Sequence, residues 1–182
     1  VFRFEQDFYT NKGQNLVELK ENFPLLFPDE TPDSIWIAKI NNPDEQELFQ
    51  ETQKKYNSLL HIEEELSKLF KHIKHYNPTF LAPDVITILS NIDYTYRTIY
   101  TDNLLFISLD VYLGDDHPFY SDYPSYIRKN NTDERIVVDV ASNIINSTIS
   151  FSNNRSFLAK MIHEGKKNVF ARPLFTIEIR SN

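Results

Sequence analysis

The residues best suited to catalysis or metal binding lie between Met161 and Lys167, a segment with the sequence MIHEGKK. A His-Glu pair on a helix is the first half of the motif His-Glu-x-x-His, in which two histidines one turn apart bind zinc and the glutamate acts as general base. Here Lys167 stands where the second histidine is required, and a protonated ammonium has no lone pair for a metal. His163 and Glu164 are therefore either the remnant of a zinc site or a chance pair on a solvated helix face, and the spacing favours the chance pair.

A catalytic zinc site needs several protein ligands and an open position for water. The motif supplies only His163, and the chain has no cysteine to provide others. The remaining histidines are His61, His72, His75 and His117. His72 and His75 have the spacing of helical metal sites, but lysines flank both, so we expect solvated or partly stacked rings. The sequence therefore predicts no metal, no cofactor and no catalytic residue.

The helix that carries the His-Glu pair is predicted from Arg155 to Lys167. Its predicted apolar face consists of Phe157, Leu158, Met161 and Ile162. His163 and Lys167 share a face roughly opposite, as a catalytic helix would require, because one face of such a helix packs while the other meets a cleft.

A second group of candidate residues lies in a polar, aromatic loop from Asp110 to Tyr126. The candidate binding residues are Asp110, Asp115, Asp116, Tyr120 and Tyr123. Carboxylates among aromatic rings suit a peptide, sugar hydroxyls or calcium, although the spacing does not match an EF-hand. Because the loop directly follows a predicted strand, we expect it at the C-terminal edge of the sheet, lining a surface concavity. The alternative is a structural loop, with packed tyrosine rings and aspartates that cap turns.

Composition argues against several other functions. The chain has 182 residues with 26 acidic and 19 basic ones, and its formal charge of −7 argues against binding a polyanion such as nucleic acid. It has only three glycines, which excludes a glycine-rich phosphate loop. No segment approaches the ~18 consecutive apolar residues that span a bilayer.

The pattern of apolar residues indicates a single α+β domain over residues 1–182. Its parts are residues 14–77 (helical), 84–113 (a small sheet of about three to four strands) and 131–167 (helical). From Asp44 to Tyr76 there is no glycine or proline, and a break near Asn57 favours two helices over one. Ile62 and the apolar residues after it step by four, three and four, which predicts the seam of an amphipathic helix.

Segments rich in β-branched and aromatic residues predict the strands. They cover residues 84–91, 94–100 and 104–112, with a further strand from Leu174 to Ile179. Loose alternation from Val1 to Thr10 predicts an edge strand.

The run from Leu109 to Asp116, LDVYLGDD, resembles the gliding motility lipoprotein GldB family of Bacteroidetes-type bacteria. Other segments resemble the family in the same order: FEQDFY from Phe4, LFKHIKHYNP from Leu69, PDVIT from Pro83 and IHEGKK from Ile162. The resemblance covers about residues 2–167. It implies a distant relation to zinc peptidase-like proteins, and on that view Lys167 marks the loss of a site.

Family members continue well beyond the Gly-Lys-Lys segment. Here Lys167 is followed at once by the stretch from Asn168 to Ile179, which resembles a segment that the family places much later. We therefore expect a missing segment between Lys167 and Asn168.

The resemblance implies a non-catalytic, lipid-anchored domain of the cell envelope that faces the periplasm and acts as an accessory factor in gliding motility and the associated protein secretion. Its partners would be other envelope proteins of that machinery, and its membrane anchor a lipidated cysteine preceding Val1. Two alternatives remain open. One is a zinc-dependent hydrolase or peptidase that uses His163 and Glu164, and the other is a module that recognises a peptide or glycan through its Asp and Tyr loop.

Overall fold

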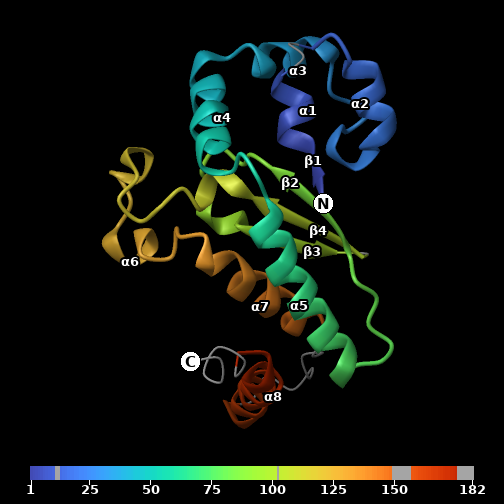
Figure 1. Ribbon diagram of the computed structural model, residues 1–182, viewed down its shortest axis with the longest axis vertical. Helices are drawn as coiled ribbons and strands as arrows, with labels where there is room; N and C mark the ends of the chain where they lie inside the picture. Colours follow the sequence, from blue (N-terminus) through green and yellow to red (C-terminus); the bar gives the residue numbers. More distant parts are fainter. Residues whose placement is uncertain (11–12, 102, 149–156, 176–182) are drawn as a thin grey trace.

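The computed structural model describes residues 1–10, 13–101, 103–148 and 157–175, which fold around a small mixed sheet (Figure 1). The strands are β1 (Phe2–Arg3), β2 (Asp84–Ile88), β3 (Thr98–Thr101) and β4 (Leu104–Ser108). Their order is β1-β2-β4-β3, with β3 antiparallel to β4 and the other neighbours parallel. The helical N-terminal half and this sheet confirm the α+β class predicted from the sequence.

The helices gather around this sheet and at both ends of the molecule. They are α1 (Phe4–Thr10), α2 (Leu16–Asn22), α3 (Asp33–Ile40), α4 (Pro43–Lys55), α5 (Leu60–Tyr76), α6 (Ser125–Arg128), α7 (Glu134–Thr148) and α8 (Phe157–Phe175), with the 3₁₀ turns η1 (Pro24–Leu26), η2 (Tyr94–Tyr96), η3 (Leu109–Val111) and η4 (Pro118–Tyr120). Helices α1, α2 and α3 lie at one end in Figure 1, with α4 beside them. Helices α5 and α7 contact each other, and α7 also contacts β3. Helix α8 lies at the opposite end of the molecule, where it contacts α5 and α7.

The long helical segment divides into two helices, as predicted. Helix α4 ends at Lys55 and α5 begins at Leu60, so the break includes Asn57. The buried seam of α5 consists of Ile62, Leu66, Leu69 and Ile73. Those residues recur every three or four positions, which places them on one side of the helix, facing the core.

Two hydrophobic clusters stabilise the fold. The larger one joins α4, α5, α7 and the sheet, and Leu105, Ile107 and Ile144 in it are completely buried. The smaller one joins α1, α2 and α3 around residues such as Phe8 and Ile40. Burial of large apolar side chains is the dominant favourable term in folding, so each cluster fixes the helices that contribute to it.

The first ten residues are mainly helical, and the predicted edge strand was wrong beyond its start. Only Phe2 and Arg3 pair with β2, at the edge of the sheet. Phe4 and Phe8 lie one turn apart in α1 with stacked rings, 5.2 Å between centroids, and both contact Phe27. Aromatic residues four apart share a helix face, and this spacing prevailed over the looser alternation.

The other strands lie where they were predicted but are shorter. Strand β2 ends at Ile88 and β4 at Ser108, and residues 94–96 form a 3₁₀ turn before β3. The backbone at Asn91 and Ile92 is left-handed, with φ of 57° and 61°, a conformation that an extended strand excludes.

Helix α8 continues beyond its predicted end at Lys167 and passes through Asn168. Leu174 and Phe175, the first two residues of the predicted final strand, belong to this helix. The rest of that strand lies outside the described residues. The missing segment between Lys167 and Asn168 stays a prediction.

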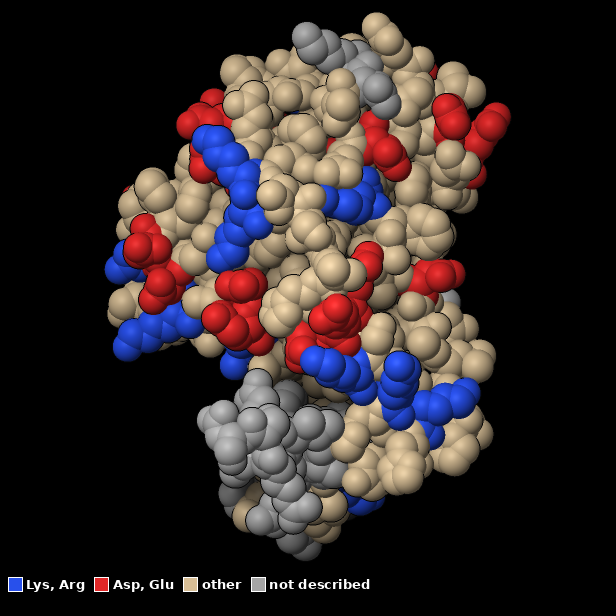
Figure 2. All heavy atoms as spheres, viewed as in Figure 1, with Lys and Arg blue, Asp and Glu red and all other residues tan. Residues whose placement is uncertain are grey.

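The charged side chains are mixed over the face shown in Figure 2, where basic groups stand beside acidic ones in several places. The ion pairs of the protein include Lys39 with Glu45 and Lys55 with Asp133. Among the described helices, none has a stretch that is both long and apolar enough to cross a bilayer.

A buried carboxylate connects α1 to the sheet. Glu5 is completely buried, its Oε1 accepts a hydrogen bond from Nε of Arg3 at 2.9 Å, and its Oε2 accepts one from Oγ1 of Thr87 at 2.6 Å. A buried charge is costly unless it is paired and hydrogen-bonded, so the two donors keep Glu5 compatible with this position.

We expect Thr87→Val to lower the free energy of unfolding by about 2 kcal/mol, because a buried carboxylate loses a hydrogen bond while the shape of the side chain is kept. Urea unfolding followed by circular dichroism measures the change. Thr95→Val is the matched control, since Thr95 is exposed, and it should change stability by less than about 0.5 kcal/mol. Equal stability of the two variants would show that the bond to Glu5 contributes nothing.

Candidate functional site

The candidate site lies where the parallel strands β2 and β4 end. Two neighbouring parallel strands bring the segments that follow them to the same edge of the sheet, a common place for ligand sites in sheets of this kind. Here those segments are residues 89–92 after β2 and residues 109–126 after β4. The predicted Asp and Tyr loop therefore begins at the C-terminal edge of the sheet, as expected.

Asp110 connects the two segments. It lies in η3 and is completely buried. Its two carboxylate oxygens accept hydrogen bonds from the backbone N–H of Ser90, both at 3.0 Å, and Oδ2 accepts a further one from the N–H of Ile92 at 2.6 Å. The Ser90 hydroxyl lies 3.4 Å from each oxygen. Asp110 therefore satisfies the backbone donors of a turn that belongs to the neighbouring strand.

The turn that Asp110 holds has an unusual backbone. Asn91 and Ile92 are consecutive residues with positive φ. Asparagine tolerates this region, but a β-branched residue such as isoleucine adopts it only when surrounding contacts enforce it. The hydrogen bond from Ile92 to Asp110 is one of those contacts.

Burial dominates the electrostatics of Asp110. It raises the pKa of the carboxyl to about 6, even though the bonds from Ile92 and Ser90 favour the ionised form. The folded protein therefore holds the proton more tightly than the unfolded chain, in which an aspartate titrates near pH 4.

The two candidate tyrosines complete an internal network with Asp110. The Tyr120 hydroxyl donates to the backbone oxygen of Asp110 at 2.6 Å and accepts from the N–H of Leu113 at 2.9 Å. The Tyr123 hydroxyl donates to the backbone oxygen of Ile92 at 2.6 Å, and its ring stacks on that of Tyr120 with centroids 6.1 Å apart. Burial also raises the pKa of the Tyr120 hydroxyl. The Tyr123 hydroxyl therefore binds the loop to the turn after β2, whereas the Tyr120 hydroxyl forms its bonds within the loop.

The remaining two candidates, Asp115 and Asp116, are exposed. The structure thus brings Asp110, Tyr120 and Tyr123 together and leaves these two outside their network. A ligand role for any of the five residues stays a prediction.

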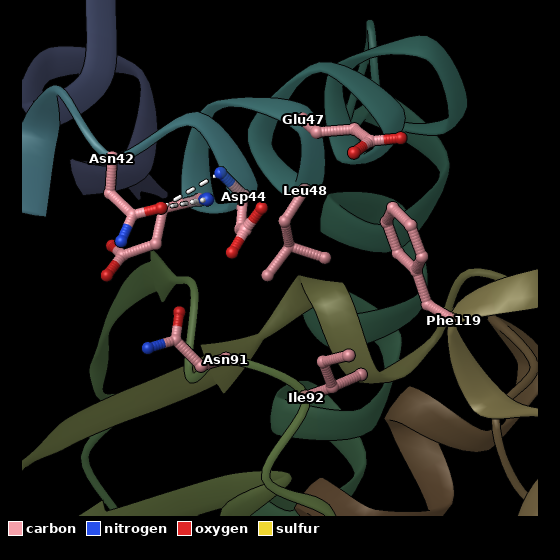
Figure 3. Close-up of a pocket in the computed structure, with 8 residues that line it drawn as sticks. Asn42, Asp44, Glu47, Leu48, Asn91, Ile92 and Phe119 are labelled. Carbon is pink, nitrogen blue, oxygen red and sulfur yellow. Dashed lines mark hydrogen bonds between the residues drawn. The ribbon is translucent and has the colours of Figure 1, made fainter. Parts of the chain in front are cut away.

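A cavity of about 430 Å³ lies beside this network (Figure 3). Its lining comes from the start of α4, the turn after β2 and the loop after β4, and consists of Asn42, Asp44, Glu45, Glu47, Leu48, Asn91, Ile92 and Phe119. In Figure 3, Leu48 and Ile92 point toward each other, with Phe119 to one side. The loop after β4 therefore does line a concavity, but through Phe119 and not through the five candidates.

Helix α4 supplies the polar wall of the cavity. The Asn42 side chain caps the helix, with Oδ1 accepting from the N–H of Asp44 at 2.9 Å and of Glu45 at 3.4 Å, and Pro43 is the first helical residue. An asparagine followed by proline and two acidic residues is a typical helix start. The sequence analysis did not identify these residues as part of a site. The pattern predicts where the helix begins but not which other segments its N-terminus will face.

The three carboxylates of this wall differ in their partners. Glu45 is neutralised by Lys39, with 2.8 Å between Oε2 and Nζ, and it also accepts a hydrogen bond from the Tyr9 hydroxyl at 2.5 Å. For Asp44 and Glu47, by contrast, the described part of the chain contains no ion-pair partner. The wall therefore carries two uncompensated negative charges.

The His-Glu pair lies elsewhere, on α8. His163 is buried, whereas Met161 and Ile162, predicted for the packed face, are 56% and 51% exposed. The predicted orientation of the helix was therefore wrong. Glu164 is exposed and forms an ion pair with Lys167 at 2.9 Å, and this lysine lowers the pKa of the Glu164 carboxyl.

His72 and His75 pack against an aromatic ring at the end of α5. The rings of His72 and His75 both contact the ring of Tyr76 edge-on, with centroids 5.2 Å and 5.0 Å apart, in keeping with the expected solvated or partly stacked rings. Within the described ranges, no three His, Asp or Glu side chains lie close enough together to hold a metal ion.

The raised pKa of Asp110 has a measurable consequence. Its contribution to stability is greatest below pH 4 and declines as the pH rises toward 6. We expect the unfolding free energy of the wild type, relative to that of Asp110→Asn, to fall by about 2 kcal/mol between pH 4 and pH 7, because one pKa unit corresponds to about 1.4 kcal/mol and the unfolded carboxyl is already about half ionised at pH 4. Asp115→Asn, which changes an exposed aspartate of the same loop, is the control for the loss of one carboxyl group. A difference that grows with pH would show that the folded state favours the ionised carboxylate.

Comparison with known proteins identifies the family. A family model described as gliding motility protein GldB matches residues 1–177. No curated protein and no solved structure gives a significant match. The family description connects the chain with gliding motility, and its designation as a lipoprotein family connects it with membrane-associated proteins of the cell envelope. Because the match covers nearly the whole sequence, this chain belongs to the gliding motility protein GldB family.

Proposed function

We propose that this chain is a non-catalytic domain of an envelope lipoprotein, and that it assists gliding motility and the associated protein secretion by holding another envelope protein at the cavity beside α4. The observation that carries the proposal is the cavity itself. Its apolar floor is closed by a turn that Asp110 holds in a left-handed conformation, so the site is formed before any partner arrives. A binding site that needs little rearrangement loses less entropy when it is occupied.

The side chains that could act as acids or bases already form hydrogen bonds or ion pairs within the protein, which supports a binding role over catalysis. The Asp110 carboxylate and the Tyr120 and Tyr123 hydroxyls are engaged within the protein, which suits a structural task. A general base must be free to accept a proton from a substrate or water. The Glu164 carboxylate is instead paired with the Lys167 ammonium, which disfavours protonation.

The proposed anchor is lipid attached N-terminal to the domain, on the periplasmic side of the envelope. The lipoprotein designation of the family supports this arrangement. Stable membrane attachment requires two signals, such as two acyl chains, and a lipidated cysteine can carry them. An anchored domain of this kind would meet its partner at the membrane surface.

A gliding bacterium that lacks its own copy of the gene provides the test. We expect the full-length protein carrying Asp44→Lys and Glu47→Lys to reach wild-type levels in the membrane fraction but to leave colonies unable to spread. The control carries Glu18→Lys and Glu21→Lys on α2, both exposed, with the same change in net charge, and it should restore spreading. Normal spreading with the α4 variant would refute a role for the cavity.

The same strain tests the non-catalytic part of the proposal. We expect His163→Ala and Glu164→Gln to restore gliding, since neither residue contributes to the cavity. Loss of gliding with Glu164→Gln, at an unchanged protein level, would favour the hydrolase instead, because this substitution removes a base while nearly preserving the shape of the side chain.

A further inference from the structure

The N-terminus of α4 does not offer an anion site, although helix N-termini often bind anions through free N–H groups. Pro43 has no N–H, and the N–H groups of Asp44 and Glu45 are bound by the Asn42 side chain. The next N–H, of Gln46, donates to the Asn42 backbone oxygen at 2.9 Å. The donors that would recognise an anion are therefore already occupied.

The wall instead presents acceptors and negative charge. Asp44 and Glu47 are three residues apart, so they are neighbours on the surface of α4. Both are exposed. Asn91 adds a side-chain amide from the opposite side of the cavity, as Figure 3 shows. Neighbouring carboxylates repel each other, and a cation placed between them removes this repulsion.

The floor of the cavity is apolar. Leu48 is buried, and Ile92 and Phe119 are partly buried. The His117 ring packs against Phe119 at 4.8 Å between centroids, and its Nε2 lies 3.8 Å from Glu51. His117 thus supports Phe119 from a position outside the cavity lining.

We infer that the occupant of the cavity is an arginine side chain of the partner polypeptide, an inference that rests on the proposed binding function. An acidic wall above an apolar floor fits a cation on an aliphatic stem, because such a side chain buries its stem while its head stays at the polar rim. Arginine fits better than lysine for two reasons. Its guanidinium forms several hydrogen bonds to carboxylates in fixed directions, and its plane stacks on an aromatic ring such as Phe119.

A bare metal ion fits the site less well. Divalent cations require several oxygen ligands at short distances around one point. Asp44 and Glu47 lie on the exposed face of α4, and among described residues they form no metal-sized group with a third carboxylate or histidine. Two separated acceptors suit the spread charge of a guanidinium.

The test is an NMR titration of the 182-residue chain with acetyl-Gly-Arg-Gly-amide and with the same peptide carrying citrulline or lysine in place of arginine. Citrulline has nearly the shape of arginine but no charge. We expect the arginine peptide to shift the backbone amide signals of Glu47, Asn91, Ile92 and Phe119, and to bind about tenfold more tightly than the citrulline peptide, since charge-assisted hydrogen bonds are the stronger ones. Added salt should weaken the arginine complex and leave the citrulline complex almost unchanged.

The variant Asp44→Asn with Glu47→Gln should bind the arginine peptide about tenfold more weakly, because it removes both charges and keeps the side-chain shapes. Glu18→Gln with Glu21→Gln, on α2, is the control and should bind as the wild type does. Each variant is shown to be folded if its spectrum matches that of the wild type at residues outside the cavity.

Equal binding of the arginine and citrulline peptides, tighter binding of a lysine peptide, or no shifts at the cavity would each overturn the inference. Its failure is separable from that of the proposed function. If arginine fails to bind but the α4 charge-reversal variant still abolishes gliding, the cavity is used by a partner of different chemistry. If arginine binds and gliding is unaffected, the binding site is real and the proposed function is wrong.

Discussion

The burial of Asp110 is the constraint on which the candidate site depends. Removing a carboxylate from water is costly, and here the cost is offset by backbone donors from a single turn. The same bonds hold Ile92 in a conformation that isoleucine otherwise avoids. Ile92 in turn supplies the floor of the cavity and the backbone oxygen that binds Tyr123. One buried charge therefore fixes the turn after β2, the loop after β4 and the shape between them.

Helix α4 completes the site because both hydrophobic clusters hold it. Directly after its last residue, Tyr56 is buried in the larger cluster and donates a hydrogen bond from its hydroxyl to the backbone oxygen of Tyr112 at 2.6 Å. On the other side, the Phe49 ring stacks on Tyr9 of α1 with 5.4 Å between centroids, and the Tyr9 hydroxyl binds Glu45. The acidic wall is thus fixed relative to the floor by contacts with the two hydrophobic clusters on either side of α4.

The sequence predicted what depends on local periodicity. The seam of α5, the two-helix division near Asn57 and the position of the central strands followed from apolar spacing. Around Phe4 and Phe8 the apolar spacing fitted both a helix and a strand. Packing in the aromatic cluster favoured the helix, and the members of that cluster come from segments distant in sequence. The same limit applied to α8, because the face of a helix that packs is chosen by the neighbouring elements. The burial of His163 could not be obtained from its own segment.

The candidate site shows the same division more sharply. Asp110, Tyr120 and Tyr123 were selected because their side chains can bind ligands, and the fold uses those side chains to bind its own backbone. The cavity lining joins α4 to a turn more than forty residues later and a loop more than seventy residues later. A single sequence does not predict which distant segments come into contact, although it does predict the helix start at Asn42.

The negative charge of the acidic wall needs no cation from the same chain, because the N-terminus of the helix stabilises it. Carboxylates in the first turn interact favourably with the positive end of the helix dipole, so Asp44 needs no cation from its own chain. Glu45, which points toward α1, has received one from Lys39, whereas Glu47 on the cavity side has not. Of the three carboxylates that line the cavity, the fold has therefore neutralised the one beside α1 and left the other two without an ion-pair partner among the described residues. A partner cation at this wall would replace water without breaking an existing ion pair, so its binding would carry little internal cost.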